Sequence, residues 1–260
     1  LLCLSSCDFL DETAYNKVTV GNFYTTKDGI TNGVNGLYST LRGMYIQEYL
    51  IYMCEGPSDI WIGHQGHEQW YNWTIDATNA DVRSFWYSCY KSVNQCNAVI
   101  ESLENNDIPG LDEDLKTRFL AESLFIRAHY FYHLVQQFGD IPMPLKPTNS
   151  VETTAHKTKV DEVWNQIVTD LEFAVENLPE TYQASEFGHI TKYAAMHHLS
   201  RVYLTLKRSD DDLKKALNYA EQVINSGKYR WLNRTQNYGI SIIKIIRKSF
   251  SLFCIRKMRN

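Results

Sequence analysis

The segment that decides the fold is AESLFIRAHYFYHLVQQFGDIPMP, Ala121–Pro144. Its apolar side chains recur every three or four residues, which is the spacing of an α-helix. One stripe follows this spacing and further apolar residues widen it: Leu120, Leu124, Ala128, Phe131, Val135 and Phe138, with Ala121, Phe125, Tyr132 and Leu134. An apolar surface on nearly every side predicts a helix buried among others. The aromatic residues are therefore expected to form core, not a binding surface.

Both ends of this helix carry recognisable signals. Asp112 or Asp114 is suited to cap its N-terminus with a side-chain oxygen. Gly139 permits a left-handed stop, and Pro142 and Pro144 prevent the helix from resuming. The helix is thus expected to extend to Phe138.

The charged residues of the helix need partners if it is buried. Arg118 is placed to pair with Glu122 one turn further along. Arg127 has no such partner on its own helix, so we expect it to form hydrogen bonds with a neighbouring helix or turn.

Five other segments show the same helical spacing. They are Asp28–Leu50, Asp81–Asn105, 157–180, 189–208 and 210–229. Amphipathic helices joined by short turns, with Ala and Tyr where helices must approach closely, predict an all-α fold. We expect a tetratricopeptide-like array of helical hairpins, in which the repeat is degenerate because the pairs differ in length. Gly227 is expected to end the last helix.

A long irregular loop near the N-terminus interrupts this array. Between Cys54 and Asn79 the periodicity disappears, and the segment EGPSDIWIGHQGHEQWYNWTIDATNA concentrates Gly, Trp, Tyr and His. Loops carry binding residues more often than the elements they connect. Large aromatics in an aperiodic stretch therefore need either burial or a ligand.

The sequence holds no strong metal or cofactor signal. His64, His67 and Glu68 in the loop, and His129 and His133 one helical turn apart, have the best metal spacings. Neither group has an evident third ligand. We therefore predict no metal site and no cofactor, and expect the helical histidines to serve packing.

Enzyme motifs are also missing from the sequence. It contains no nucleophile elbow, no phosphate-binding loop and no dinucleotide fingerprint. A glycosidase needs two carboxyl groups at a fixed separation. Asp59, Glu68 and Asp76 offer the acids, but nothing in the sequence fixes their separation, so we predict that the protein is not an enzyme.

The charge is distributed unevenly. Residues 222–260 contain nine Lys and Arg and no Asp or Glu, which leaves 17 basic and 30 acidic groups, a net −13, in the remainder. A body of that charge does not attract nucleic acid. Residues 233–260 lack a period and a cap, so we predict an aberrant tail such as a frameshift would produce. The alternative is a basic arm for a membrane or a nucleic acid.

The N-terminus fits a bacterial lipobox. Leu4-Ser5-Ser6-Cys7 has an apolar residue, two small residues and then the thiol that takes a diacylglyceryl group. Residues 1–7 would then be the remnant of a signal peptide with its lipobox. Acyl chains on Cys7 would anchor the protein to a bilayer without a spanning helix. The alternative is an ordinary apolar segment with an isolated cysteine.

Three of these features together resemble the SusD/RagB family of outer-membrane lipoproteins. They are Cys7, the segment Ala121–Pro144 and a late run of helices. The family form of the second is close to Ala-Glu-x-x-Phe-Leu-Arg-Ala-x-x-Tyr-Phe-x-Leu, then Phe-Gly-Asp-x-Pro. The third reads VWNQIVTDLEFAVENLP, GHITKYAAMHHLSRVYLTL and ALNYAEQVINSGKY.

The resemblance implies both an organisation and a role. Residues 8–232 would form the N-terminal helical domain of a family whose members are normally around twice as long, so a shortened product is expected. Such proteins are lipid-anchored at the outer membrane, capture glycans and deliver them to a SusC-like TonB-dependent transporter. They are binding proteins and not enzymes.

A glycan site needs aromatic platforms for the apolar faces of sugars and short polar groups for their hydroxyls. The irregular loop supplies both, and the candidate glycan-binding residues are Asp59, Trp61, His64, Trp70, Tyr71, Trp73 and Asp76. The alternative for Trp61, and for one of Trp70 and Trp73, is that they fix the loop onto the helices. Three residues of the following helix, Arg83, Trp86 and Asn94, are expected to serve packing and capping. The competing function is a tetratricopeptide-like scaffold that binds a protein partner through its concave face.

Overall fold

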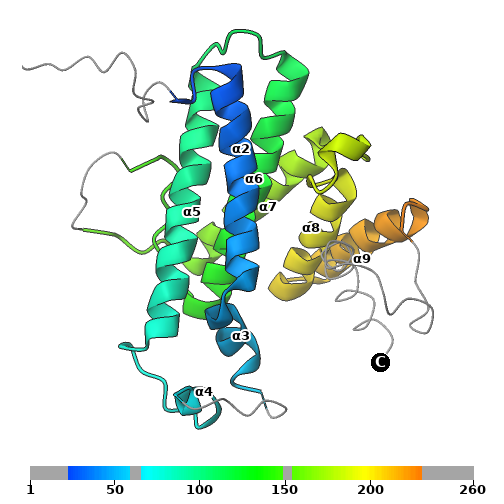
Figure 1. Cartoon of the computed structure of the whole chain (residues 1–260). Helices are drawn as coiled ribbons and strands as arrows, with labels where there is room; N and C mark the ends of the chain where they lie inside the picture. Colours follow the sequence, from blue (N-terminus) through cyan, green and yellow to red (C-terminus); the bar gives the residue numbers. More distant parts are fainter. Residues whose placement is uncertain (1–22, 59–65, 149–153, 230–260) are drawn as a thin grey trace, which may run out of the picture.

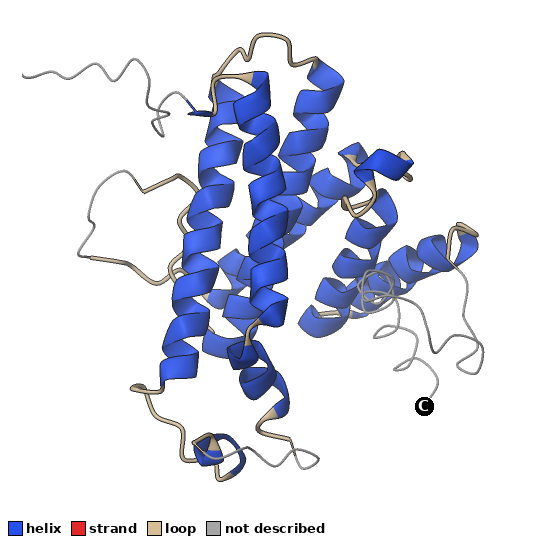
Figure 2. Cartoon of the chain, viewed as in Figure 1, coloured by secondary structure: helices blue, strands red, loops and turns tan. Residues whose placement is uncertain are grey.

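The computed structural model describes residues 23–58, 66–148 and 154–229. Across these residues the chain is helical apart from its connections and one isolated antiparallel bridge between Ile141 and Thr158 (Figure 2). The α-helices are α2 (Lys27–Ile46), α3 (Glu48–Glu55), α4 (Glu68–Tyr71), α5 (Ala80–Asn105), α6 (Glu113–Phe138), α7 (Val160–Asn177), α8 (Lys192–Leu206) and α9 (Asp210–Asn225), with a 3-10 turn, η1 (Ala184–Glu186). The predicted all-α class is confirmed. Cys7 and the predicted tail 233–260 lie outside the described residues.

Successive helices pack against one another along the chain. Helix α5 packs against α6, α6 against α7, α7 against α8 and α8 against α9. Helix α2 joins the pair α5 and α6, and the three run side by side (Figure 1). This arrangement confirms the predicted array of helical hairpins.

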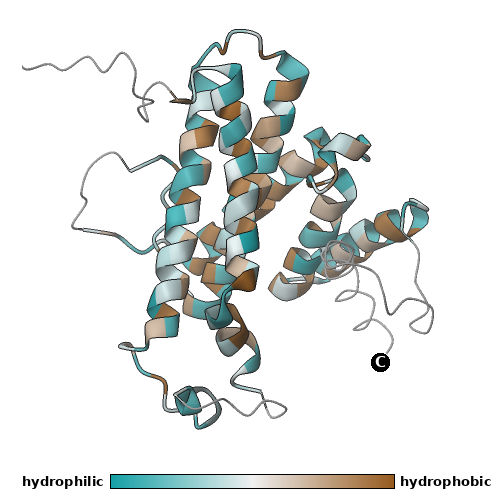
Figure 3. Cartoon of the chain, in the orientation of Figure 1, coloured by the Kyte–Doolittle hydropathy of each residue, from teal (hydrophilic) through white to brown (hydrophobic). Residues whose placement is uncertain are grey.

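Helix α6 is the centre of the packing. Every residue from 121 to 132 is buried, which is more than three full turns without a solvent-facing side. It packs against α2, α5 and α7, and the segment before α8 and His198 of α8 also contact this stretch. The outer helix α9 instead shows hydrophilic and hydrophobic residues side by side along its length, as a surface helix does (Figure 3). The aromatic residues of the deciding segment are therefore core, as predicted.

The predicted ends of α6 are also confirmed. Oδ1 of Asp112 accepts a hydrogen bond of 2.8 Å from the backbone N–H of Leu115, so Asp112 and not Asp114 is the cap. Gly139 follows the helix with φ of 69°, a backbone conformation that side chains with a Cβ rarely adopt.

One predicted helix, Asp28–Leu50, is wrong in its extent. The helix breaks at Gln47, whose φ of −75° and ψ of 138° are extended, and α3 begins at the next residue. The break reorients the chain so that Leu50 and Met53 reach the core beside α5. The sequence has neither Pro nor Gly at this position, so no local signal marks the break.

Glu122 is a fully buried carboxylate that α6 contributes to the core. Its Oε2 accepts hydrogen bonds from Tyr38 Oη (2.7 Å) on α2 and meets Nδ1 of His189 at 2.9 Å. Its Oε1 accepts from Tyr182 Oη (3.1 Å) and lies 3.4 Å from Nε of Arg118, which confirms the predicted pair one turn apart. Glu122 thus joins α6 to α2 and to the segment before α8.

Arg127 is the second charged side chain inside the array. It donates two hydrogen bonds of 2.9 Å to the carboxylate of Asp170 on α7 and one of 3.1 Å to Oδ1 of Asn97 on α5. The expectation that Arg127 forms hydrogen bonds with a neighbouring helix is confirmed. Burial raises the pKa of Asp170 even though the hydrogen bonds and charge of Arg127 oppose the shift. The pair is therefore costly to desolvate, and each member depends on the other.

Breaking this pair from one side should be strongly destabilising. Arg127→Met leaves the Asp170 carboxylate buried without its cation, and we expect a loss of about 3–5 kcal/mol in the free energy of unfolding. Arg127→Met combined with Asp170→Leu should recover most of that loss. Urea denaturation followed by circular dichroism measures both.

The control for this experiment is Lys159→Met, which removes the exposed ion pair of 2.8 Å with Asp140. It should leave the unfolding midpoint almost unchanged, because water screens an exposed pair. An Arg127→Met protein as stable as the parent would contradict a structural role for the buried pair.

Three histidines from two helices meet between α6 and α8: His129, His133 and His198. His197 precedes His198 on α8 and is also buried. Nδ1 of His129 lies 3.4 Å from Nε2 of His198, and Nε2 of His129 lies 2.8 Å from Oη of Tyr45 on α2. Burial lowers the pKa of His197 to about 4, with the nearby Arg201 acting in the same direction. Burial also holds the pKa of His129 and His198 well below their usual range. The folded protein thus keeps these rings neutral.

A depressed histidine pKa makes stability depend on pH in a defined direction. The unfolded chain binds protons below about pH 6.5, whereas folded His197 does so only near pH 4, so stability falls as pH falls through this window. For His197 we expect a loss of about 2 kcal/mol between pH 7.5 and pH 5. Urea denaturation at the two pH values measures it. His197→Gln should reduce the difference, and equal stability of the parent at both pH values would refute the expectation.

Candidate functional site

The segment that joins α3 to α5 carries the described part of the aromatic loop. It contains the short helix α4 and lies at one end of α2 and α5 (Figure 1). Three of the predicted glycan-binding residues, Asp59, Trp61 and His64, lie outside the described residues. Trp70, Tyr71, Trp73 and Asp76 can be placed.

Trp70 fastens this segment to the core. Its side chain is 4% exposed, and its indole Nε1 donates a hydrogen bond of 3.1 Å to Oδ2 of Asp81 on α5. A Cβ at Gly56 would collide with the Tyr52 carbonyl oxygen and lie 2.9 Å from Cβ of Trp70, so the close approach requires glycine. In this structure the ring of Trp70 offers no face to a ligand.

His67 makes a second attachment at the same place. Its ring stacks on Tyr52 of α3 at 3.8 Å between centroids, with 17° between planes, and its Nδ1 lies 3.3 Å from Oδ2 of Asp81. One carboxylate in the first turn of α5 thus holds both Trp70 and His67. In the described part of the chain no group of three or more His, Cys, Asp and Glu is arranged to hold a metal ion.

Trp73 lies only three residues after Trp70, yet it is 73% exposed. Its φ is 58°, in the left-handed region that bulky residues avoid. Such a conformation costs on the order of 1–3 kcal/mol and persists only where the surroundings impose it. An exposed apolar ring presented by strained backbone is a feature of binding sites more than of passive loops.

Polar contacts fix the backbone around Trp73. The N–H of Thr74 donates to the Gln69 carbonyl oxygen at 3.0 Å, and Nδ2 of Asn79 donates to Oε1 of Gln69 at 3.0 Å. Asn79 also caps α5 through its Oδ1. Tyr71, in α4, is half-buried. In the described part of the loop these contacts form a structured platform, on which Trp73 is the most exposed aromatic ring.

The two loop acids that the structure describes, Glu68 and Asp76, are bonded within its turns. Oδ1 of Asp76 accepts hydrogen bonds from the hydroxyl (2.6 Å) and N–H (2.8 Å) of Thr78, and these bonds lower the pKa of Asp76. The pKa of Glu68 is lowered by hydrogen bonds from its own backbone N–H and from that of Gly66. A glycosidase acid needs the opposite shift, because it must stay protonated until it donates. Neither carboxyl group suits that role.

Three residues of α5, Arg83, Trp86 and Asn94, were expected to serve packing and capping. Trp86 packs edge-on against Phe138 at 4.8 Å and tilted against Tyr90 at 4.7 Å. Asn94 accepts a hydrogen bond of 2.7 Å from the N–H of Thr148. Trp86 therefore packs, as predicted, and Asn94 holds the segment after α6, while Arg83 is exposed.

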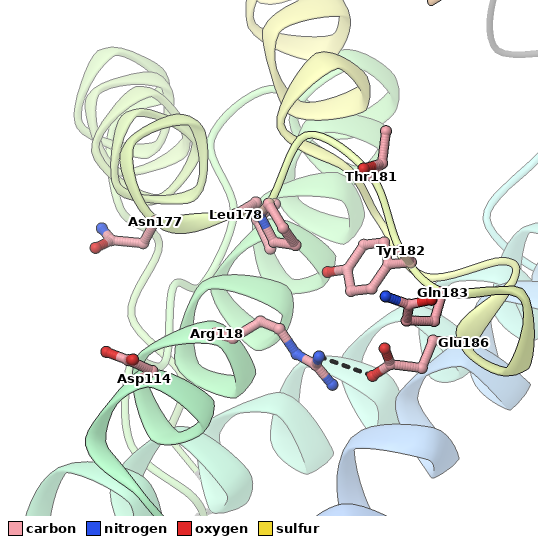
Figure 4. Close-up of a pocket in the computed structure, with 9 residues that line it drawn as sticks. Asp114, Arg118, Asn177, Leu178, Thr181, Tyr182, Gln183 and Glu186 are labelled. Atoms are coloured by element: carbon pink, nitrogen blue, oxygen red, sulfur yellow. Dashed lines mark hydrogen bonds and ion pairs between the residues drawn. The ribbon is translucent and has the colours of Figure 1, made fainter.

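A shallow polar pocket of about 340 Å³ lies at the connection between α7 and α8, on the N-terminal half of α6 (Figure 4). Arg118 points across it and donates a hydrogen bond of 2.8 Å to Oε1 of Glu186. The same guanidinium lies over the Tyr182 ring at 5.3 Å and beside buried Glu122. The cation of this pocket is thus already neutralised from within the protein.

A second pocket, between α2, α3 and α5, was not foreseen from the sequence. Its lining residues come from α2, α3, α5 and the break at Gln47. The first of them, Thr40, and the last, Gln95, are 55 residues apart in the sequence. No motif or composition bias connects those positions, so only packing could reveal them.

Comparison with known proteins gives the family. Residues 8–204 match the model of a SusD-like family described as starch-binding and associating with the outer membrane. The chain is 29% identical over 234 residues to SusD-like protein P2 of Formosa agariphila, with 87% of this chain and 45% of that protein covered.

Solved structures share the fold. One, a crystal structure with xylogluco-oligosaccharide, has a TM-score of 0.69 at 21% identity and covers 78% of this chain and 41% of that one. Another, a laminarin-binding SusD-like protein, has a TM-score of 0.65 at 24% identity and covers 77% and 44%. The chain thus spans less than half the length of these proteins.

No helix in the described parts of the chain has the length and apolar character to cross a membrane.

The family match extends over most of the chain, and it agrees with the helical array in the structure. The chain therefore belongs to the SusD-like family of starch-binding proteins that associate with the outer membrane.

Proposed function

We propose that this protein binds a glycan on the surface around Trp73. The observation that carries the proposal is the exposed Trp73 ring, held at φ of 58° by a segment that Trp70 and His67 fasten to α3 and α5. An aromatic face stacks on the apolar face of a sugar ring. Asn72, Tyr71 and Asp76 lie within three residues of it and supply polar groups for sugar hydroxyls.

The wider role follows from the family. Its description as starch-binding, and the laminarin and xylogluco-oligosaccharide named with two proteins of the same fold, support a glycan as the ligand. We infer that the protein captures the glycan without breaking a bond and delivers it to a SusC-like TonB-dependent transporter. A lipid on Cys7 would hold it at the outer membrane, exposed at the cell surface.

Affinity electrophoresis in gels that contain laminarin or xyloglucan tests the binding, followed by a glycan array. Trp73→Ala should weaken binding at least tenfold, because the stacking surface is lost and 1.4 kcal/mol already corresponds to tenfold. The matched control is Phe187→Ala, which removes an exposed aromatic ring beside η1. Circular dichroism checks that each variant is folded.

Two outcomes would count against the proposal. If no glycan retards the folded protein, the binding role fails for this chain. If a glycan binds equally well to the parent and to Trp73→Ala, the site lies elsewhere.

The strain at Trp73 gives an independent prediction. Glycine adopts a positive φ freely, so Trp73→Gly should be more stable than Trp73→Ala by about 1 kcal/mol, although neither variant keeps the ring. Lys207, with φ of 43° at the end of α8, offers a reference position where glycine should gain similarly over alanine. Thermal or urea unfolding measures both pairs. An alanine variant at position 73 as stable as the glycine variant would show that the backbone there is not strained.

A further inference from the structure

The backbone conformation of Trp73 depends on contacts with α4. A positive φ is unfavourable for a tryptophan, so the chain leaves this conformation unless its surroundings oppose the change. Those contacts come from Gln69, whose carbonyl oxygen accepts a hydrogen bond from the N–H of Thr74 and whose Oε1 accepts one from Nδ2 of Asn79, both at 3.0 Å. Thr74 and Asn79 follow Trp73 in the chain. The conformation of Trp73 is therefore tied to the position of α4.

Helix α4 is in turn held in place by one carboxylate of α5. Trp70, which follows Gln69, donates its indole N–H to Oδ2 of Asp81 at 3.1 Å. His67, at the N-cap position of α4, places its Nδ1 3.3 Å from the same oxygen. A helix of four residues has little stability of its own, so these attachments decide where it lies. Asp81 thus acts on Trp73 through α4.

His67 is the member of this cluster whose residue type changes charge near neutral pH. Its side chain is 28% exposed, so protons reach it from solvent. The titratable groups that face it are Asp81 on α5, Tyr52 on α3 and its own neighbour Glu68, and the Tyr52 hydroxyl donates to Oε2 of Glu48 at 3.3 Å. These groups are acids and a phenol. A proton on His67 therefore adds the attraction of opposite charges to its contact with Asp81.

We propose that His67 and Asp81 position Trp73 for glycan binding, and that the affinity for the glycan rises as His67 takes up a proton. The inference rests on the proposed function, because it takes the Trp73 surface as the glycan site. A stronger attachment of α4 raises the fraction of molecules in which the strained backbone presents the ring, and the apparent affinity follows that fraction. His67 and Asp81 are positioning residues and do not contact the glycan.

Isothermal titration calorimetry with laminarin and xyloglucan oligosaccharides, at about pH 8 and about pH 6, tests the coupling. Both glycans are neutral, so their own charge does not change with pH. The parent should bind roughly threefold more tightly at the lower pH, which is the effect of one partly exposed ion pair. His67→Gln and Asp81→Asn should each bind equally at the two pH values, because neither can form the ion pair. Asparagine at position 81 keeps an oxygen that accepts from the Trp70 indole.

The matched control is His156→Gln, which removes an exposed histidine before α7. It should keep the threefold difference. Circular dichroism at both pH values checks that each variant is folded.

Hydrogen exchange at the N–H of Thr74 measures the same coupling without a glycan. After correction for the intrinsic exchange rate, protection of this N–H in the parent should be roughly threefold higher at about pH 6 than at about pH 8. His67→Gln should remove the difference, whereas His156→Gln should keep it. This measurement reports how firmly α4 holds the chain around Trp73.

Three results would overturn the inference: equal protection of Thr74 at the two pH values, a pH dependence that His67→Gln or Asp81→Asn retains, or a glycan affinity that stays constant while the protection changes. In each of these cases a glycan that binds the parent but not Trp73→Ala leaves the proposed function standing. Conversely, pH-dependent protection of Thr74 in a protein that binds no glycan would refute the proposed function and the affinity change, and would leave only the attachment of α4 by His67 and Asp81.

Discussion

The fold depends on the pairing of charges inside a helix that has no exposed side. Helix α6 is buried through residues 121–132, so a charged side chain within that stretch cannot reach water. Glu122 is instead surrounded by donors from α2 and from the segment before α8, and Arg127 makes hydrogen bonds to α5 and α7. An unpaired charge in such a place would be strongly unfavourable. The two residues therefore require the neighbouring helices to take one arrangement around α6.

The candidate site inherits its geometry from this core. Helix α5 packs against α6 along its length and presents Asp81 at its N-terminal end, where the carboxylate holds Trp70 and His67. These attachments fix the short helix α4, and the chain then turns so that Trp73 faces outward. The exposed ring is thus positioned by the buried Trp70 before it and by the hydrogen bonds of Thr74 and Asn79 to Gln69 after it, as a preorganised binding surface requires.

Exposed polar surface on the same helices is used differently at different places. Near the N-terminal half of α6 the protein satisfies its own cation, since Arg118 is enclosed by Glu122 and Glu186. Between α2, α3 and α5 the lining has hydroxyls, amides and Lys91 but no carboxylate. The first arrangement stabilises the connection between α7 and α8, whereas in the second the Thr40 and Ser92 hydroxyls donate hydrogen bonds to carbonyl oxygens of their own helices.

The sequence alone predicted the helical array, the burial of α6 and the approximate ends of that helix. Apolar spacing, an Asp at 112 or 114 and Gly139 act within one or two turns, so they can be seen in the local sequence, and the structure decided that Asp112 is the cap. It also predicted the Arg118–Glu122 pair and the need of Arg127 for a partner on another element. Part of the family resemblance rests on the same segment, and its Ala121, Glu122, Arg127 and Ala128 are all buried in the structure.

Only the tertiary structure decided which tryptophan faces solvent. Trp70 and Trp73 lie in one aperiodic stretch, and contacts of Trp70 with Gly56 and Asp81, on the elements before and after the loop, bury the first ring while the second is exposed. The break at Gln47 and the pocket around Lys91 have the same origin, since they arise where α3 packs on α5. Periodicity reports which face of a helix is apolar, but it contains no information about how one helix meets another. Sites assembled from several helices are therefore decided by packing.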